Sequence, residues 1–86
     1  MKVQYDKSAD VLYVTLRKQD PKQCRFVENE NGDVLKIDRL TGHVVGVTII
    51  AFLLRINRGL EVNIPEIRAI PFAEFAKNIT GHNTSH

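Results

Sequence analysis

Residues 3–16 read VQYDKSADVLYVTL, in which two β-prone runs flank a short polar turn. The runs are rich in valine, tyrosine and threonine, which strands favour. Asp6 and Asp10 stand at the two ends of the turn, where aspartate side chains commonly bond nearby backbone amides. The stretch therefore predicts a hairpin. The expected core face of its second strand consists of Leu12, Val14 and Leu16.

Residues 38–50 read DRLTGHVVGVTII and supply a second turn followed by the most apolar run of the chain. Within residues 44–50, apolar side chains occupy both odd and even positions, which indicates a strand buried on both faces at the centre of the sheet. Gly46 interrupts this strand, and a glycine there marks a bulge or a close approach by another element.

Two further strands are predicted between these stretches, at residues 24–28 and 34–37. The turn that joins them contains Asn31 and Gly32, a pair that tolerates the positive φ of a tight hairpin. We therefore expect Gly32, and Gly42 in the following turn, at positive φ.

The apolar period changes after the central strand. Residues 51–58 predict a short helix, with extension of the preceding strand as the rival interpretation. Residues 60–64 alternate strictly and predict another strand that ends at Pro65. Residues 71–79 predict an amphipathic helix, and residues 81–86 a frayed polar tail.

These segments predict one small α+β domain over residues 1–80, with a mainly antiparallel sheet of four to six strands and one or two short helices. A chain of 86 residues buries only about 60% of its unfolded surface, so the core is small. Cys24 is the only cysteine, which precludes an intrachain disulfide. That cysteine usage, together with an N-terminus that lacks an apolar signal core, leads us to expect a cytoplasmic protein.

Charge and hydropathy narrow the range of partners. Twelve basic and ten acidic residues are interspersed and give a net charge of +2, whereas nucleic-acid binders usually carry a basic stripe. The longest apolar run, residues 47–54, is far shorter than the ~20 residues of a membrane span. We therefore expect neither a nucleic acid nor a membrane as partner.

Three polar side chains are candidates for chemistry: Asp6, Asp10 and His43. The carboxylate pair could bind a cation or share a proton, and His43 could act as a ligand or base. Each of the three residues also has a simpler interpretation without chemistry. Aspartate side chains commonly cap turns, and a histidine beside Gly42 would be an exposed turn residue. No ligand cluster, phosphate loop or nucleophile motif accompanies them. We therefore predict no catalytic, cofactor-binding or metal-binding residue, and we expect Asp6 and Asp10 to accept backbone amide bonds.

The two quoted stretches resemble the YuzE-like family of small bacterial proteins, known as domain of unknown function 2283. The resemblance rests on YDxxADxLYV at residues 5–14 and on DxxTGxVVGV at residues 38–47, and it covers about residues 2–55. It implies a compact antiparallel sheet with a little helix and no established activity. Because members of such families sometimes sit beside RelE-like toxins, it also implies, by association, an antitoxin-like role.

Three functions remain open at this point. The first is a protein–protein interaction module that forms a homodimer through apolar residues within 44–54 or 72–75, since the chain offers more apolar surface than one small sheet hides. The second is the antitoxin-like partner of a small RelE-like toxin. The third is a metal-binding protein or enzyme that uses Asp6, Asp10 and His43.

Overall fold

The computed structural model describes residues 1–59 and 62–84. The chain divides into two compact units, Met1–Phe52 and Leu53–His86. The first unit holds the sheet, and the second holds most of the helical structure. Within the described residues, no helix is long and apolar enough to span a bilayer.

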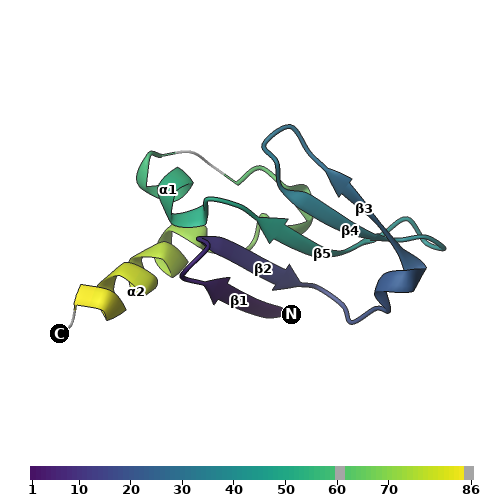
Figure 1. Cartoon of the computed structure of the whole chain (residues 1–86), viewed down its shortest axis with the longest axis horizontal. Coiled ribbons are helices and arrows are strands. Elements are labelled where there is room, and N and C mark those ends of the chain that lie inside the picture. The colour runs from purple at the N-terminus through teal and green to yellow at the C-terminus, as the bar shows by residue number, and fades with distance from the viewer. Residues whose placement is uncertain (60–61, 85–86) are drawn as a thin grey trace. The chain divides into compact units, whose positions relative to one another are not determined.

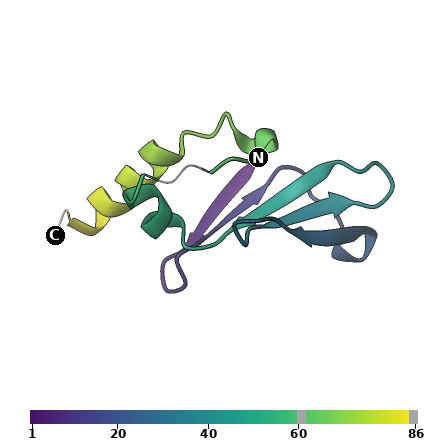
Figure 2. The same cartoon turned by 90° about the horizontal axis from the view of Figure 1, so that it is seen from above.

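The first unit is a five-stranded antiparallel sheet (Figure 1). Its strands are β1 (Lys2–Asp6), β2 (Val11–Thr15), β3 (Cys24–Glu28), β4 (Val34–Asp38) and β5 (Val44–Ile49). They lie in the order β1-β2-β5-β4-β3, and Figure 2 shows the same sheet from above. The prediction of a small α+β fold with an antiparallel sheet is confirmed, and β5 occupies the centre as expected.

The strand register gives the sheet one buried face and one open face. Leu12 pairs with Ile49 and Val14 pairs with Val47, and all four side chains are buried. The opposite side of the same strands is much more accessible. We call this side the open face; its central side chains are those of Tyr13, Phe26, Val34, Lys36 and Thr48, with Gly46 among them.

A register irregularity lies beside Gly46, as a glycine within a strand indicates. Lys36 pairs with Gly46, whereas the next residue, Ile37, pairs with Val44. Val45 is the extra residue on β5, and its side chain is almost fully buried. The bulge therefore keeps an apolar side chain in the core where the simple alternation of the strand is interrupted.

The turns follow the sequence predictions closely. Gly32 has a φ of 85° and Gly42 has a φ of 76°, so both expected positive-φ glycines are confirmed. Two other residues share this left-handed region: Asp10 with a φ of 54° and Ala51 with a φ of 48°. Aspartate tolerates this conformation better than alanine, so Ala51 is the more strained of the two.

The second unit begins within α1 (Phe52–Asn57), which confirms the short helix and excludes the rival strand extension. The strand predicted at residues 60–64 is wrong for 62–64, and residues 60 and 61 lie outside the described part of the chain. A 3₁₀ turn, η2 (Pro65–Ile67), starts there instead, and the Ile64 carbonyl accepts the Ile67 amide at 3.1 Å. That carbonyl is therefore used within the turn.

The C-terminal helix α2 (Phe72–Thr84) begins one residue after the predicted start at Pro71 and continues past the expected end at residue 79. Its last residues include positions that the sequence analysis assigned to the polar tail, and residues 85 and 86 lie outside the description. Phe72 and Ala76 on this helix are buried. The apolar spacing therefore located the helix but not its end.

Replacing Gly32 or Gly42 with alanine is expected to lower the free energy of unfolding by about 1 kcal/mol, because alanine is strained at positive φ. The two changes should cost about the same. A Cβ at Gly32 would lie 2.9 Å from the terminal Cδ1 methyl of the exposed Ile50 side chain, which can move aside, and nothing lies within 4 Å of a Cβ at Gly42. Chemical denaturation measures both values. Two variants as stable as the parent chain would contradict the turn geometry.

Ala51→Gly is expected to have the opposite effect and to raise the free energy of unfolding by about 1 kcal/mol, because it relieves the strain at a φ of 48°. The matched control is Ala9→Gly in the β1–β2 turn, where φ is not positive and glycine only adds unfolded-state entropy. Thermal and urea unfolding of both variants test this. Equal destabilisation by the two changes would show that Ala51 is unstrained.

Candidate interaction surface

The first candidate, Asp6, caps the turn between β1 and β2. Its Oδ1 atom accepts the Ser8 amide at 3.0 Å, the Ser8 hydroxyl at 2.7 Å and the Ala9 amide at 3.3 Å. The hydroxyl of Ser8 is the largest cause that holds the pKa of Asp6 below its ordinary value. The expectation that this aspartate accepts backbone amides is confirmed.

Asp10 hydrogen-bonds through both its side chain and its backbone, and the expectation that its carboxylate accepts backbone amides stays a prediction. Its Oδ1 atom accepts a hydrogen bond from the Tyr5 hydroxyl at 2.8 Å, and its backbone carbonyl accepts the Phe52 amide at 3.0 Å. The Tyr5 ring also meets the Phe52 ring edge-on, with centroids 6.1 Å apart. Burial, and then the hydrogen bond to Asp10, raise the pKa of Tyr5 to about 12. The carboxylate thus joins the turn to β1, and the backbone carbonyl joins it to Phe52 at the end of the sheet unit.

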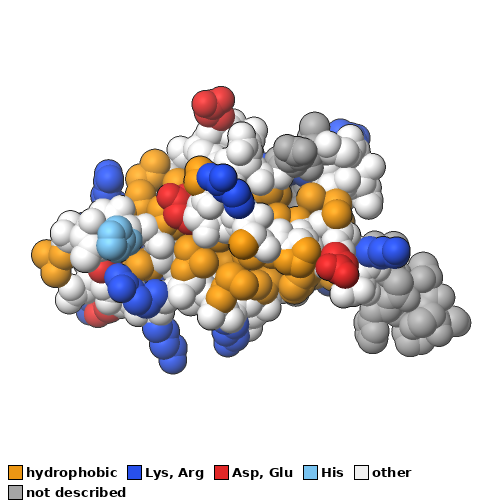
Figure 3. All heavy atoms as spheres, turned by 180° about the vertical axis from the view of Figure 1, so that it is seen from behind, with side chains coloured by type: hydrophobic (Ala, Val, Ile, Leu, Met, Phe, Trp, Pro, Cys, Tyr) orange, Lys and Arg blue, Asp and Glu red, His pale blue; other side chains and the backbone are white. Residues whose placement is uncertain are grey.

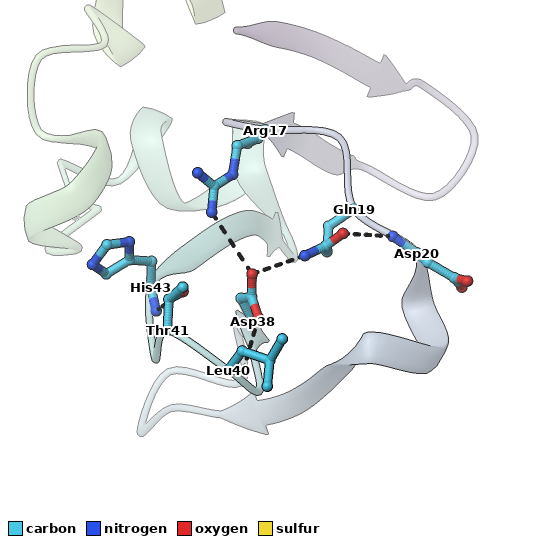
Figure 4. A network of polar contacts seen from close by, with 7 residues as sticks. All are labelled: Arg17, Gln19, Asp20, Asp38, Leu40, Thr41 and His43. Atoms are coloured by element: carbon cyan, nitrogen blue, oxygen red, sulfur yellow. Dashed lines mark hydrogen bonds and ion pairs between the residues drawn. The ribbon is translucent and has the colours of Figure 1, made fainter.

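A denser polar cluster surrounds Asp38 at the opposite end of the sheet (Figure 4). The Asp38 side chain is only 4% exposed. Its Oδ2 atom accepts the Gln19 side-chain amide at 2.8 Å and lies 3.7 Å from the Arg17 guanidinium, while Oδ1 accepts the Leu40 amide at 2.9 Å. The Leu40 amide foremost, and then Gln19, lower the pKa of Asp38. Through these partners, Asp38 connects the turn after β4 with residues of the segment between β2 and β3.

The same cluster fixes the long connection from β2 to β3. This connection contains the 3₁₀ turn η1 (Pro21–Gln23), which Asp20 caps. Lys36 Nζ donates to the Gln19 carbonyl at 2.9 Å, and the Arg39 amide donates to the Gln23 carbonyl at 3.0 Å. The connection is therefore tied to β4 and to the turn that follows β4.

His43 takes part in this region through its backbone. Its carbonyl accepts the Asp38 amide at 2.9 Å, and its own amide donates to Thr41 Oγ1 at 3.2 Å. The imidazole is exposed and points away from the Asp38 carboxylate (Figure 4).

The structure does not bring the three candidate residues together. Leu12 pairs with Ile49, so the turn with Asp6 and Asp10 lies near the end of β5, whereas His43 precedes its start. A six-residue strand is about 20 Å long, which places His43 far beyond the reach of the aspartates. Among the described residues, no three His, Cys, Asp or Glu side chains form a group that could hold a metal ion.

The open face is the feature that polar-residue reasoning missed. Tyr13 is 43% exposed and Phe26 is 58% exposed, which is unusual for aromatic side chains. Between them lies a hollow of about 180 Å³ whose floor includes Gly46. Because Phe26 pairs with Lys36, and Lys36 pairs with Gly46, the ring stands two strands from this floor. The open face therefore carries the projecting Phe26 ring and the hollow over Gly46 in one cross-strand row.

The apolar segments proposed from the sequence are only partly available. Within residues 44–54, Ile50 and Leu54 are exposed. Within residues 72–75, Phe72 is buried and Phe75 is half-buried, so these rings contribute to packing within the chain. Charged side chains on the face seen in Figure 3 are interspersed with apolar ones, as the sequence indicates. The homodimer itself stays a prediction.

A comparison with known proteins finds no matching family model, no matching curated protein and no matching solved structure. The YuzE-like resemblance therefore stays an expectation that rests on residues 5–14 and 38–47. What the open face can do follows from its own side chains.

Stability is expected to fall in acid because Asp38 and Asp6 both have lowered pKa values. A carboxylate whose folded pKa lies below the unfolded value stabilises the fold above about pH 4, and this contribution is lost as the pH falls through the folded pKa. Asp38→Asn should lower the free energy of unfolding at pH 7 and flatten its decline below pH 5. The decline that remains is the part due to Asp6. Urea unfolding across this pH range measures the change.

Glu30→Gln is the matched control, because Glu30 is an exposed carboxylate in the β3–β4 turn. It should leave the stability at pH 7 close to that of the parent chain. If Asp38→Asn behaves like this control, the Asp38 cluster does not hold the connection between β2 and β3.

Proposed function

We propose that this chain is a cytoplasmic protein–protein interaction module that self-associates as a homodimer through the open face of its sheet. The supporting observation is the row in which the exposed Phe26 ring stands beside the hollow over Gly46. The single free cysteine, Cys24, is buried and needs no oxidising compartment, which supports the cytoplasmic part of the proposal.

The open face provides a driving force for association. Full burial of an exposed phenylalanine side chain stabilises by about 1.5–3 kcal/mol. Phe26 and Tyr13 are both available for such burial, and the half-buried Val34 and Thr48 lie in the same cross-strand row as Tyr13. A second protein layer over this face would remove these side chains from water.

A second copy of the chain fits this face because each copy carries both a projecting ring, Phe26, and a hollow that can receive a ring. The strand spacing places the Phe26 row position about 10 Å from Gly46 on the same surface. In a twofold dimer each copy offers its ring to the other copy's hollow, so one contact is made twice. The hollow of about 180 Å³ equals the volume of roughly six liquid water molecules, which a phenyl ring can displace.

Lys36 lies between the ring and the hollow, and its charge must be accommodated. Its Nζ atom donates to the Gln19 carbonyl at 2.9 Å, so the ammonium is directed to the β2–β3 connection. The aliphatic part of the side chain then contributes apolar surface to the open face. The positive charge is therefore held at the border of the proposed contact.

A second candidate function is an antitoxin-like partner of a small RelE-like toxin. The observation that favours it is the separate compact unit Leu53–His86, which can carry a partner-binding role apart from the sheet. Coexpression with a neighbouring toxin gene tests this candidate. Copurification that depends on the second unit supports it, and a toxin that does not copurify with the full chain contradicts it.

Phe26→Asp is expected to convert the dimer into a monomer, because it places a charge in the proposed apolar contact while β3 stays at the sheet edge. Leu40→Asp is the matched control: Leu40 is 86% exposed but lies in the β4–β5 turn, away from the open face. Light scattering after size exclusion at micromolar concentration measures both masses, and circular dichroism checks the fold.

The parent chain and Leu40→Asp should have twice the monomer mass, and Phe26→Asp the monomer mass. The interface should bury more than about 1,000 Å² in total, the level below which stable association is uncommon. A folded parent chain that is monomeric, or a Phe26→Asp variant that stays dimeric, would remove the open face as the interface.

A further inference from the structure

The second unit contains a cavity that the proposed dimer does not use. Its volume is about 620 Å³, within the range of about 300–1,000 Å³ that small-molecule sites occupy. Its walls come from the end of α1, from the segment before η2 and from the first turn of α2. All of these belong to the unit Leu53–His86, so the cavity is a property of that unit alone.

Most of the lining is apolar. Ile64 and Phe72 are buried side chains that form part of the wall, and Ile56 and Val62 are half-buried beside them. Gly59 also borders the cavity, and no atom lies within 4 Å of where its Cβ would be. An apolar chain of moderate length can therefore enter without displacing a side chain at this position.

The polar part of the lining consists of Arg68 and Asn63. Among the described residues that line the cavity, Arg68 is the only charged one. The η2 turn fixes its backbone, because the Arg68 amide donates to the Pro65 carbonyl at 3.3 Å. A guanidinium offers paired donors that match a carboxylate, and Asn63 adds an amide beside it.

We propose that this cavity binds a small amphipathic carboxylate, with the apolar chain against Ile64 and Phe72 and the carboxylate at Arg68. The apolar walls favour a hydrocarbon body, and the guanidinium of Arg68 favours a negative head group. Neither a neutral alcohol nor a short anion satisfies both parts of the lining. All the described residues that line the cavity belong to the second unit, whereas the open face belongs to the first.

Octanoate is the probe, and amide chemical shifts of the isotope-labelled full chain are the readout. Octanoate should cause saturable shifts at lining residues within 56–73, with a dissociation constant of about 1 mM or tighter, which a ligand of about ten non-hydrogen atoms reaches at ordinary efficiency. Octanol should bind about tenfold more weakly because it lacks the charge, and acetate should cause no saturable shift because it lacks the chain.

Arg68→Gln should weaken octanoate binding about tenfold and abolish the preference over octanol. Arg58→Gln is the matched control, since Arg58 is an exposed arginine of the same unit outside the lining. Ala73→Leu, at an exposed lining position of α2, should weaken both ligands by reducing the cavity. These three variants separate the charged head group from the apolar chain.

The proposal is overturned by any of three results: no saturable shifts with octanoate, shifts centred on the open face instead of on residues 56–73, or equal octanoate affinity in the Arg68 and Arg58 variants. Because the readout maps to the second unit, failure here leaves the homodimer proposal untouched, and failure of the homodimer leaves this site untouched.

Discussion

The pairing of β5 with β2 on one side and with β4 on the other is the constraint on which the structure depends. It alone joins the N-terminal hairpin to the second pair of strands, with Val47 opposite both Val14 and Leu35. Because residues on a strand alternate, this placement gives β5 one side with Val47 and Ile49 in the core and another with Gly46 and Thr48. The sheet therefore has a core on one face and an accessible surface with two exposed aromatic side chains on the other.

Three aspartates of the sheet unit form hydrogen bonds within the chain. Asp6 caps a turn, Asp10 holds the Tyr5 hydroxyl, and Asp38 gathers Gln19 and the Leu40 amide. A buried carboxylate needs such donors, because an unpaired one would be costly in the interior. This use of the aspartates explains why the turns that they form keep fixed shapes. It also directs the functional argument to surfaces and cavities.

Local patterns predicted much of the fold. Glycine placement determined the turns, and alternation identified Leu12 as a core position, because both depend on neighbouring residues. The partner of Asp38 could not be predicted, since Gln19 is 19 residues away and meets it only after the β2–β3 connection folds back. The exposure of Phe26 was missed for a related reason: alternation assigns a residue to a face but does not say which face is covered. Strict alternation at 60–64 also resembled a strand, although Pro65 starts a 3₁₀ turn there.

Contacts between protomers test the central claim most directly. A dimer assembled from carbon-13-labelled and unlabelled chains allows nuclear Overhauser effects between protomers to be selected. The account predicts effects that join the Phe26 ring of one copy to protons of Gly46 and Thr48 of the other. Effects for Phe26 that are only intramolecular, or intermolecular effects confined to residues 53–79, would contradict it.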